Sequence, residues 1–135
     1  MPDTARWRLA LEPHLLSLLR LVVGLLYLQH GLNKLFDFPS TPHHNAYHLL
    51  TLVPGLAGPL ETIGGFLVTI GLYTRIAAFI LSGEMAFAYF MAHAPRSPFP
   101  LQNGGEPAVL FCFTFLYLVV AGAGFWSIDR LRARH

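Results

Sequence analysis

The stretch from Leu15 to Phe36, LLSLLRLVVGLLYLQHGLNKLF, decides the fold of this chain. It contains 22 residues and is dominated by leucine and valine. An α-helix rises about 1.5 Å per residue, so a run of this length can cross the roughly 30 Å of hydrocarbon in a bilayer. The stretch therefore predicts a membrane-spanning helix.

Three more apolar runs of similar length follow. They extend from Leu52 to Tyr73, from Ile76 to Ala94 and from Pro107 to Trp126. Each run is continuously apolar, whereas the strands of a membrane β-barrel alternate between apolar and polar residues. We therefore expect an all-α fold: one polytopic membrane domain over residues 1–135, built as a four-transmembrane-helix bundle.

The composition excludes several other classes of protein. The chain is 54% hydrophobic and only 12% charged, against about 25% charged residues in a typical soluble domain. Disordered chains have the opposite composition, and the single Cys112 excludes a disulfide scaffold. The net charge is only +2 and the basic residues are dispersed, so we expect the lipid bilayer, and no nucleic acid, as a partner.

The positive charges predict the orientation of the helices. Seven arginines fall at the two termini or in the short link between the second and third runs: Arg6, Arg8, Arg20, Arg75, Arg130, Arg132 and Arg134. Only Lys34 and Arg96 fall on the opposite side. Because basic residues concentrate on the cytoplasmic side of membrane proteins, we expect both termini in the cytoplasm.

Two carboxylic acids lie within the predicted spans, Glu61 in the second and Glu84 in the third, each near the middle of the bilayer. An ionised side chain at that depth costs about 3 kcal/mol on insertion scales. We therefore expect each to be neutral or paired with a cation, and Lys34, His30 and Arg20 are the candidates.

The first span carries a polar face at a similar depth. Tyr27, His30 and Lys34 follow one another at steps of three and four residues, so they share one side of the helix. On the second span Glu61 shares a face with Ala57, Gly64 and Gly71, which is typical of close helix packing. We therefore expect Glu61 to point towards the centre of the bundle.

These polar residues have two interpretations. They form either a buried network that fixes the helix register or a protonatable site for a polar head group. On the second interpretation the catalytic residues are Glu61 and His30, and the ligand-binding residues are Tyr27, Lys34, Glu84, His93, Asn103 and Glu106. Asn103 and Glu106 flank a Gly-Gly pair, which is either a simple turn or a lid over His93.

We predict no metal site. His43, His44 and His48 lie in an outer loop, but solvated histidines are the favoured interpretation there in the absence of a second ligand cluster. The sequence also contains no flavin fingerprint, haem ligand pair at matching depth or iron–sulfur cysteines. Any electrons would therefore have to come from a partner subunit.

Five short motifs in order resemble the DoxX family. They are His30 to Phe36 (HGLNKLF), Glu61 to Gly65 (ETIGG) with Gly71 to Arg75 (GLYTR), Ala92-His93, Asn103 to Glu106 (NGGE), and Gly122 to Gly124 (GAG) with Ser127 to Asp129 (SID). The resemblance extends from about Arg20 to Arg130. One departure is Ala123, where many family members have a proline.

The resemblance implies a small four-helix protein of the bacterial inner membrane, linked to quinone-connected redox systems and to oxidative stress. Our leading hypothesis is a quinone-linked redox protein or subunit, in which Glu61 and His30 exchange protons with a quinone-like amphiphile bound in the bundle. Whether the chain is itself an enzyme, such as an oxidoreductase subunit, stays open. One alternative is a non-catalytic scaffold or assembly factor, and another is a small proton-linked transporter that works as a homo-oligomer.

Overall fold

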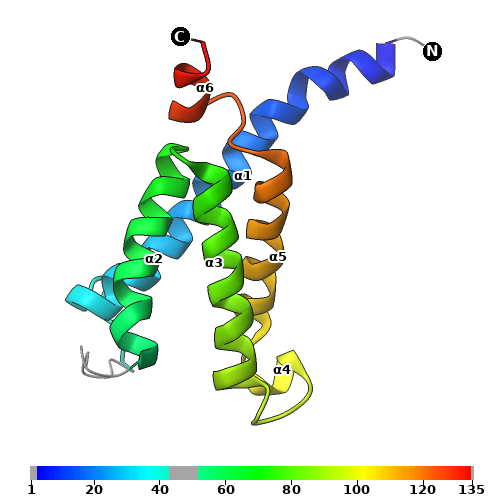
Figure 1. Cartoon of the computed structure of the whole chain (residues 1–135). Helices are drawn as coiled ribbons and strands as arrows, with labels where there is room; N and C mark the ends of the chain where they lie inside the picture. Colours follow the sequence, from blue (N-terminus) through cyan, green and yellow to red (C-terminus); the bar gives the residue numbers. More distant parts are fainter. Residues whose placement is uncertain (1–2, 43–51, 135) are drawn as a thin grey trace.

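The computed structural model describes residues 3–42 and 52–134, and this part of the chain is helical without strands. The helices are α1 (Asp3–Phe36), α2 (Leu52–Ile70), α3 (Thr74–Ala88), η1 (Tyr89–His93), α4 (Pro100–Asn103), α5 (Glu106–Ala121) and α6 (Ile128–Arg132). The predicted all-α fold is confirmed for these residues. Figure 1 shows α1, α2, α3 and α5 as the body of the molecule.

Two helical stretches, Arg6–Phe36 and Thr74–His93, are long and apolar enough to cross a membrane. Gly55–Ile70 and Glu106–Ala121 are shorter apolar helices, so the count of four spans stays a prediction. α1 begins at Asp3 rather than Leu15 and is longer than one bilayer crossing requires. α2 and α5 end earlier than expected because Gly71 and Gly122, which follow them, have positive φ angles of 70° and 85°.

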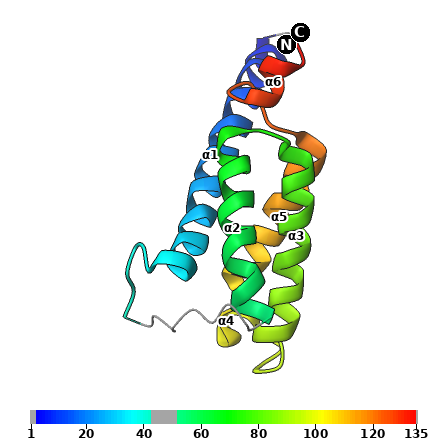
Figure 2. The ribbon, with the colours of Figure 1, turned by 60° about the vertical axis from the view of Figure 1, so that its left-hand side comes forward.

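The four long helices form two closely packed pairs, α1 with α2 and α3 with α5. α2 and α3 share fewer contacts, and α1 and α5 touch only sparsely. α2 and α3 are joined by a tight turn, and Figures 1 and 2 show this turn at the same end of the molecule as α6 and the start of α1. The opposite end carries α4. This arrangement gathers the seven arginines at one end, while their cytoplasmic location stays a prediction.

Glycines set the short distance between α1 and α2. A Cβ atom added to Gly24 would lie 2.7 Å from the backbone nitrogen of Thr69, and one added to Gly65 would lie 2.8 Å from the Cα of Leu28. Both distances are too short for any side chain, so the two backbones pack directly against each other. The face that carries Glu61 is buried along the helix, as we predicted from its small residues.

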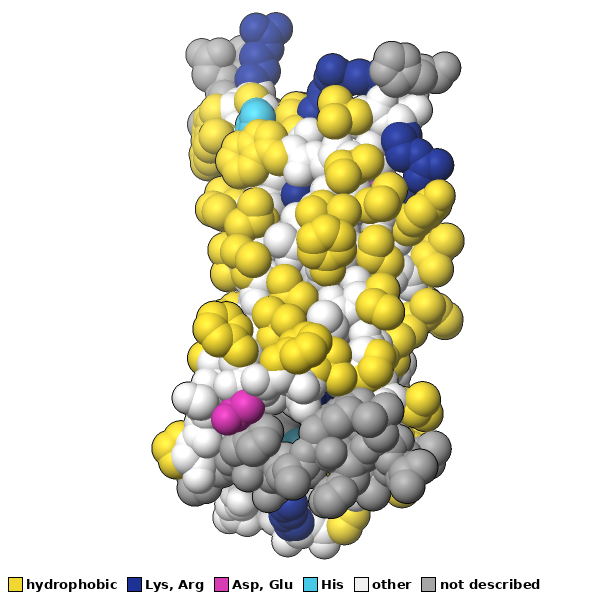
Figure 3. Space-filling view, turned by 90° about the vertical axis from the view of Figure 1, so that its left-hand side faces the viewer, with side chains coloured by type: hydrophobic (Ala, Val, Ile, Leu, Met, Phe, Trp, Pro, Cys, Tyr) yellow, Lys and Arg dark blue, Asp and Glu magenta, His cyan; other side chains and the backbone are white. Residues whose placement is uncertain are grey.

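The outer surface of the helices is strongly apolar. Leu110 on α5 is 69% exposed and Val120 is 76% exposed, and many other large apolar side chains are similar. Figure 3 shows apolar side chains covering the middle of one face of the molecule, with lysine and arginine towards its two ends. Such a surface is unfavourable in water and suits contact with lipid chains.

Arg20 ties the helices together at the end that holds both termini. Its side chain is completely buried. The guanidinium donates hydrogen bonds to the carbonyl oxygens of Val68, at 2.7 Å, and Thr69 near the end of α2. It also donates to the carbonyls of Ala123, at 2.8 Å, and Trp126, at 2.5 Å, beyond the end of α5. Two of these carbonyls lie near the end of α2, where the Val68 oxygen also accepts from the Gly71 N–H at 3.1 Å, and two lie in the segment beyond α5, so Arg20 joins the two places.

Asp129 and Arg75 complete this end of the molecule. The Asp129 carboxylate accepts hydrogen bonds from the backbone N–H groups of Tyr73, at 2.7 Å, and Thr74, at 2.8 Å, and so caps the start of α3. Arg75 donates to two carbonyl oxygens in the last turn of α5. The segment after α5 is therefore fastened to the α2–α3 turn through charged side chains and backbone groups.

Candidate functional site

A cavity of about 700 Å³ lies between the two helix pairs, in the half of the molecule away from the termini. Most of its lining is apolar, but six of the residues predicted for the site contribute to it: Tyr27, His30, Lys34, Glu61, Glu84 and His93. Three come from α1, one from α2 and two from α3 and η1. The structure therefore brings together most of the polar residues that the sequence places within the spans.

Glu61 is the most deeply buried acid of the cavity, with 2% of its surface exposed. The Lys34 ammonium lies 2.5 Å from its Oε1 atom and forms an ion pair with it. The second oxygen, Oε2, is buried without a hydrogen-bond partner. Of the three cations considered as partners for the acids, Lys34 is thus the one that pairs with Glu61, whereas Arg20 binds carbonyl groups at the other end.

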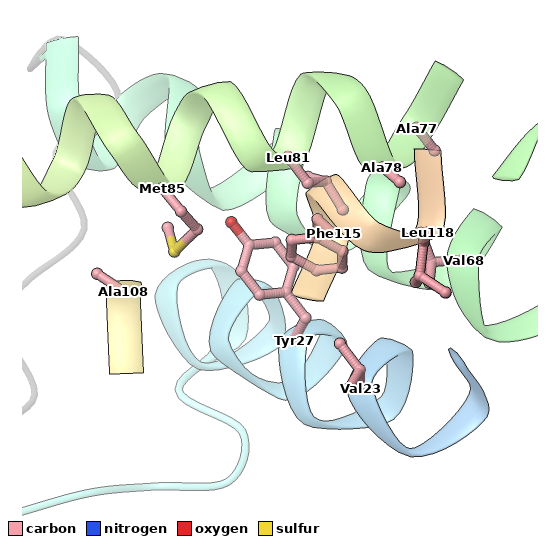
Figure 4. Packing of buried hydrophobic residues seen from close by; sticks show 10 residues of the cluster. All are labelled: Val23, Tyr27, Val68, Ala77, Ala78, Leu81, Met85, Ala108, Phe115 and Leu118. Atoms are coloured by element: carbon pink, nitrogen blue, oxygen red, sulfur yellow. The ribbon is translucent and has the colours of Figure 1, made fainter. Parts of the chain in front are cut away.

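Glu84 is held by Tyr27. The Tyr27 hydroxyl donates a hydrogen bond to Oε2 of Glu84 at 2.9 Å, and Oε1 of Glu84 is buried without a partner. The tyrosine ring packs edge-on against Phe111 and Phe115, with centroid distances of 5.1 and 4.8 Å. Figure 4 shows Tyr27 among the buried apolar side chains, with its oxygen turned towards α3. The ring is fixed by packing, so the position of its hydroxyl is fixed as well.

The two histidines occupy different surroundings. His30 packs edge-on against Phe111, with 5.8 Å between the ring centroids, and is exposed at the surface of the protein. His93 is the last residue of η1, a π-helical continuation of α3. Its Nδ1 donates a hydrogen bond to the Asn103 carbonyl oxygen at 3.0 Å, since a carbonyl oxygen can only accept. Short π-helical segments are frequent at functional sites.

Asn103 and Glu106 do not line the cavity. Asn103 is buried, and its amide group builds the turn that precedes α5. It donates to the Ser97 carbonyl at 2.9 Å and accepts from the Gly105 N–H at 2.7 Å. Glu106 is exposed in the first turn of α5. Only Gly104, between the two, contributes to the lining, and a ligand-binding role for Asn103 and Glu106 stays a prediction.

The prediction that the chain has no metal site can be compared with the structure only for the described residues. Within residues 3–42 and 52–134, no three histidine, cysteine or acidic side chains are grouped as a metal ion requires. His43, His44 and His48 lie outside the described residues.

The polar side chains of the cavity offer a specific set of groups to a ligand. Glu61 and Glu84 line the cavity, and each has one buried carboxyl oxygen without a hydrogen-bond partner among the described residues. Lys34 supplies a positive charge beside Glu61, and His30 supplies an imidazole on the same wall. Buried polar atoms are nearly always hydrogen-bonded, so these two oxygens make Glu61 and Glu84 candidates for contact with a ligand or a proton.

A family model described as DoxX matches residues 15–94. The chain is 43% identical to a Haemophilus influenzae protein described as "Uncharacterized protein", over 87% of this chain and 90% of the relative. It is 28% identical to an uncharacterized membrane protein of Mycobacterium tuberculosis, over 83% and 77%. It is 26% identical to a Bacillus subtilis protein named "Putative oxidoreductase CatD", over 83% and 82%. No solved structure matches the chain.

Proposed function

The chain belongs to the DoxX family of membrane proteins, and on this basis we propose that its cavity binds a quinone-like amphiphile for a redox system of the bacterial inner membrane. One relative is named as an oxidoreductase, which supports a redox role. The observation that carries the proposal is Glu61, which lines a cavity with apolar walls and whose buried Oε2 atom has no hydrogen-bond partner among the described residues.

The cavity fits such a ligand in size and chemistry. Its volume of about 700 Å³ lies within the range of roughly 300–1,000 Å³ that small-molecule sites occupy. The apolar walls suit a ring and an alkyl tail, and the few polar groups suit the oxygen atoms of a head group. Lys34, His30 and Glu61 supply donors and acceptors along α1 and α2, and Glu84 supplies a second carboxyl group from α3.

A bound quinone takes up two electrons and two protons when it is reduced to the quinol. Glu61 and His30 are the residues we assign to proton exchange, because a carboxyl group and an imidazole can each hold or release one proton. Lys34 stabilises the ionised form of Glu61 through the ion pair. Tyr27 orients Glu84 by its hydrogen bond. The electrons come from a partner subunit.

Binding of a short-chain quinone to protein in nanodiscs tests the proposal. We expect saturable binding of the quinone and of its quinol. The quinol hydroxyl can donate to the Glu61 carboxylate, so Glu61→Gln should weaken quinol binding about tenfold or more, because a hydrogen bond to a charged group contributes about 1.5–3 kcal/mol. Glu12→Gln is the matched control, since this acid is exposed near the start of α1 and lies outside the cavity. Quinone that copurifies with the wild-type protein would be identified by mass spectrometry.

Two results would contradict the proposal. One is the absence of saturable quinone binding by the wild-type protein. The other is equal quinol binding by wild type and Glu61→Gln while the thermal stability of the variant falls. The second result would favour a scaffold in which the ion pair between Lys34 and Glu61 only fixes the packing of α1 against α2.

A further inference from the structure

Gly83 on α3 has no packing role. A Cβ atom added to it would meet nothing within 4 Å. Four other helical glycines differ: a Cβ added to Gly64 would lie 2.6 Å from the Leu81 side chain, and those of Gly24, Gly31 and Gly65 would strike a neighbouring helix. Glycine weakens a helix relative to alanine. A glycine that no neighbouring side chain requires therefore needs another explanation.

The position of Gly83 in the cavity supplies one. Gly83 lines the cavity, directly before Glu84 in the sequence, and is exposed at the surface. Exposed apolar side chains on α2, α3 and η1 also line the cavity: Leu56, Ile80, Phe87 and Met91. α2 and α3 contact each other less than the helices within each pair do. The cavity thus reaches the lipid-facing surface between these two helices.

The depth of Gly83 places this opening inside the bilayer. Gly83 is the ninth residue after Thr74, the first residue of α3, so it lies about 13 Å along the helix. In hydrocarbon roughly 30 Å thick this is close to the middle. Glu61, whose buried Oε2 atom has no partner among the described residues, lines the same cavity. The opening therefore connects lipid chains with a polar site, which is the path that an amphiphile dissolved in the bilayer needs.

We propose that the cavity is loaded sideways from the membrane, through an opening between α2 and α3 that the missing side chain of Gly83 keeps clear. The occupant is an amphiphile whose head group reaches Glu61 while its apolar tail leaves past Gly83 towards the lipid. The choice of occupant rests on the proposed function, but the opening itself is a property of the helices.

Photolabelling tests the opening without any quinone. A small apolar aryl diazirine dissolved in the membrane labels surfaces that lipid reaches. Met85 and Ala108 line the cavity, yet each is less than 9% exposed; Figure 4 shows both. We expect residue-level mass spectrometry to find label on these two residues in the wild-type protein and to find it lost in Gly83→Trp. Gly83→Ala should keep the label, because one methyl group leaves the opening clear.

Ile63→Trp is the control for a bulky side chain at the lipid surface, since Ile63 is 62% exposed on α2 and does not line the cavity. It should leave the labelling of Met85 and Ala108 unchanged. Val68 and Leu118 are completely buried and do not line the cavity, so their lack of label reports whether each variant is folded. If Gly83→Trp does not fold, Gly83→Leu takes its place.

The outcomes separate the two proposals. No label on Met85 or Ala108 in the wild type, or equal label in wild type and the blocked variant, would overturn the lateral opening. Label that is lost in the blocked variant supports the opening even where quinone does not bind, in which case only the proposed ligand is wrong. Quinone binding that persists in the blocked variant would keep the proposed function and overturn the route.

Discussion

Replacement of Arg20 by methionine should destabilise the protein more than any other exchange of a single arginine. Methionine keeps much of the length of the side chain but has no donor, so carbonyl groups near the end of α2 and after α5 lose their partners. The wild-type guanidinium donates to four carbonyl oxygens: those of Val68, Thr69, Ala123 and Trp126. All four belong to segments far from α1 in the sequence.

The size of the effect follows from these bonds. A hydrogen bond with a charged partner contributes about 1.5–3 kcal/mol, so four independent bonds would give about 6–12 kcal/mol. The removal of a buried charge also removes its desolvation penalty, which is several kcal/mol. When this penalty is subtracted from the hydrogen-bond contribution, the free energy of unfolding falls by about 3–5 kcal/mol. At roughly 3–4 °C for each kcal/mol in a chain of this size, the melting temperature should fall by about 10–20 °C.

The assay is thermal unfolding in detergent or nanodiscs, with Arg8→Met as the control. Arg8 lies on the same helix, is exposed and contacts the Trp7 ring, so its replacement should leave the melting temperature nearly unchanged. Arg20→Lys should fall between the two, because an ammonium group cannot reach all four carbonyls. Equal melting temperatures for Arg20→Met and Arg8→Met would refute the role we give to Arg20.

Three further predictions concern separate contacts and are measured in the same melting assay. Asp129→Ala removes the acceptor for two N–H groups at the start of α3 and should cost about 1–2 kcal/mol; an unchanged melting temperature would contradict this cap. Gly24→Val should abolish folding, because its Cβ would overlap the Thr69 backbone. A folded Gly24→Val protein would show that α1 and α2 can separate. By contrast, Gly83→Ala should leave the stability of the protein unchanged or raise it slightly. Tyr27→Phe removes the donor to Glu84 and should lower stability by about 1 kcal/mol, and a stability equal to wild type would mean that water replaces the hydroxyl.

Helix depth and helix phase explain which parts of the site the sequence could predict. The steps of three and four residues place Tyr27, His30 and Lys34 on one face, and the small residues around Glu61 orient that acid inward. Each pattern depends only on the spacing of residues within one helix. The structure retains both patterns, and these residues line one cavity. Glu84 lies at a matching depth, but its hydrogen bond with Tyr27 depends on how the two helix pairs come together, which the sequence does not reveal.

Contacts that depend on backbone groups could not be predicted in this way. Arg20 was one of three cations considered for the buried acids, but it binds carbonyl oxygens that become available only where α2 and α5 end. The role of Asp129 likewise depends on the turn at Gly71, which brings the start of α3 next to the end of the chain. Asn103 is similar, since its amide is used within its own turn and a sequence motif does not reveal that geometry.

The two ends of the bundle use buried charge in different ways, and this difference locates the candidate site. At the end with the termini, the charged atoms of Arg20 and Asp129 are satisfied by backbone groups, so these side chains have a structural explanation. In the cavity, Glu61 and Glu84 each keep one buried oxygen without a partner, although a polar network that served only packing would gain stability by satisfying them. An unpaired acceptor is costly in a low-dielectric interior, and replacement of either glutamate by an apolar residue would remove that cost. Both glutamates line the cavity, so the proposed ligand or an exchangeable proton would account for their unpaired oxygens and for the cavity together. Thr74, at the other end, also has a buried oxygen without a partner among the described residues, so such an oxygen does not by itself identify a site.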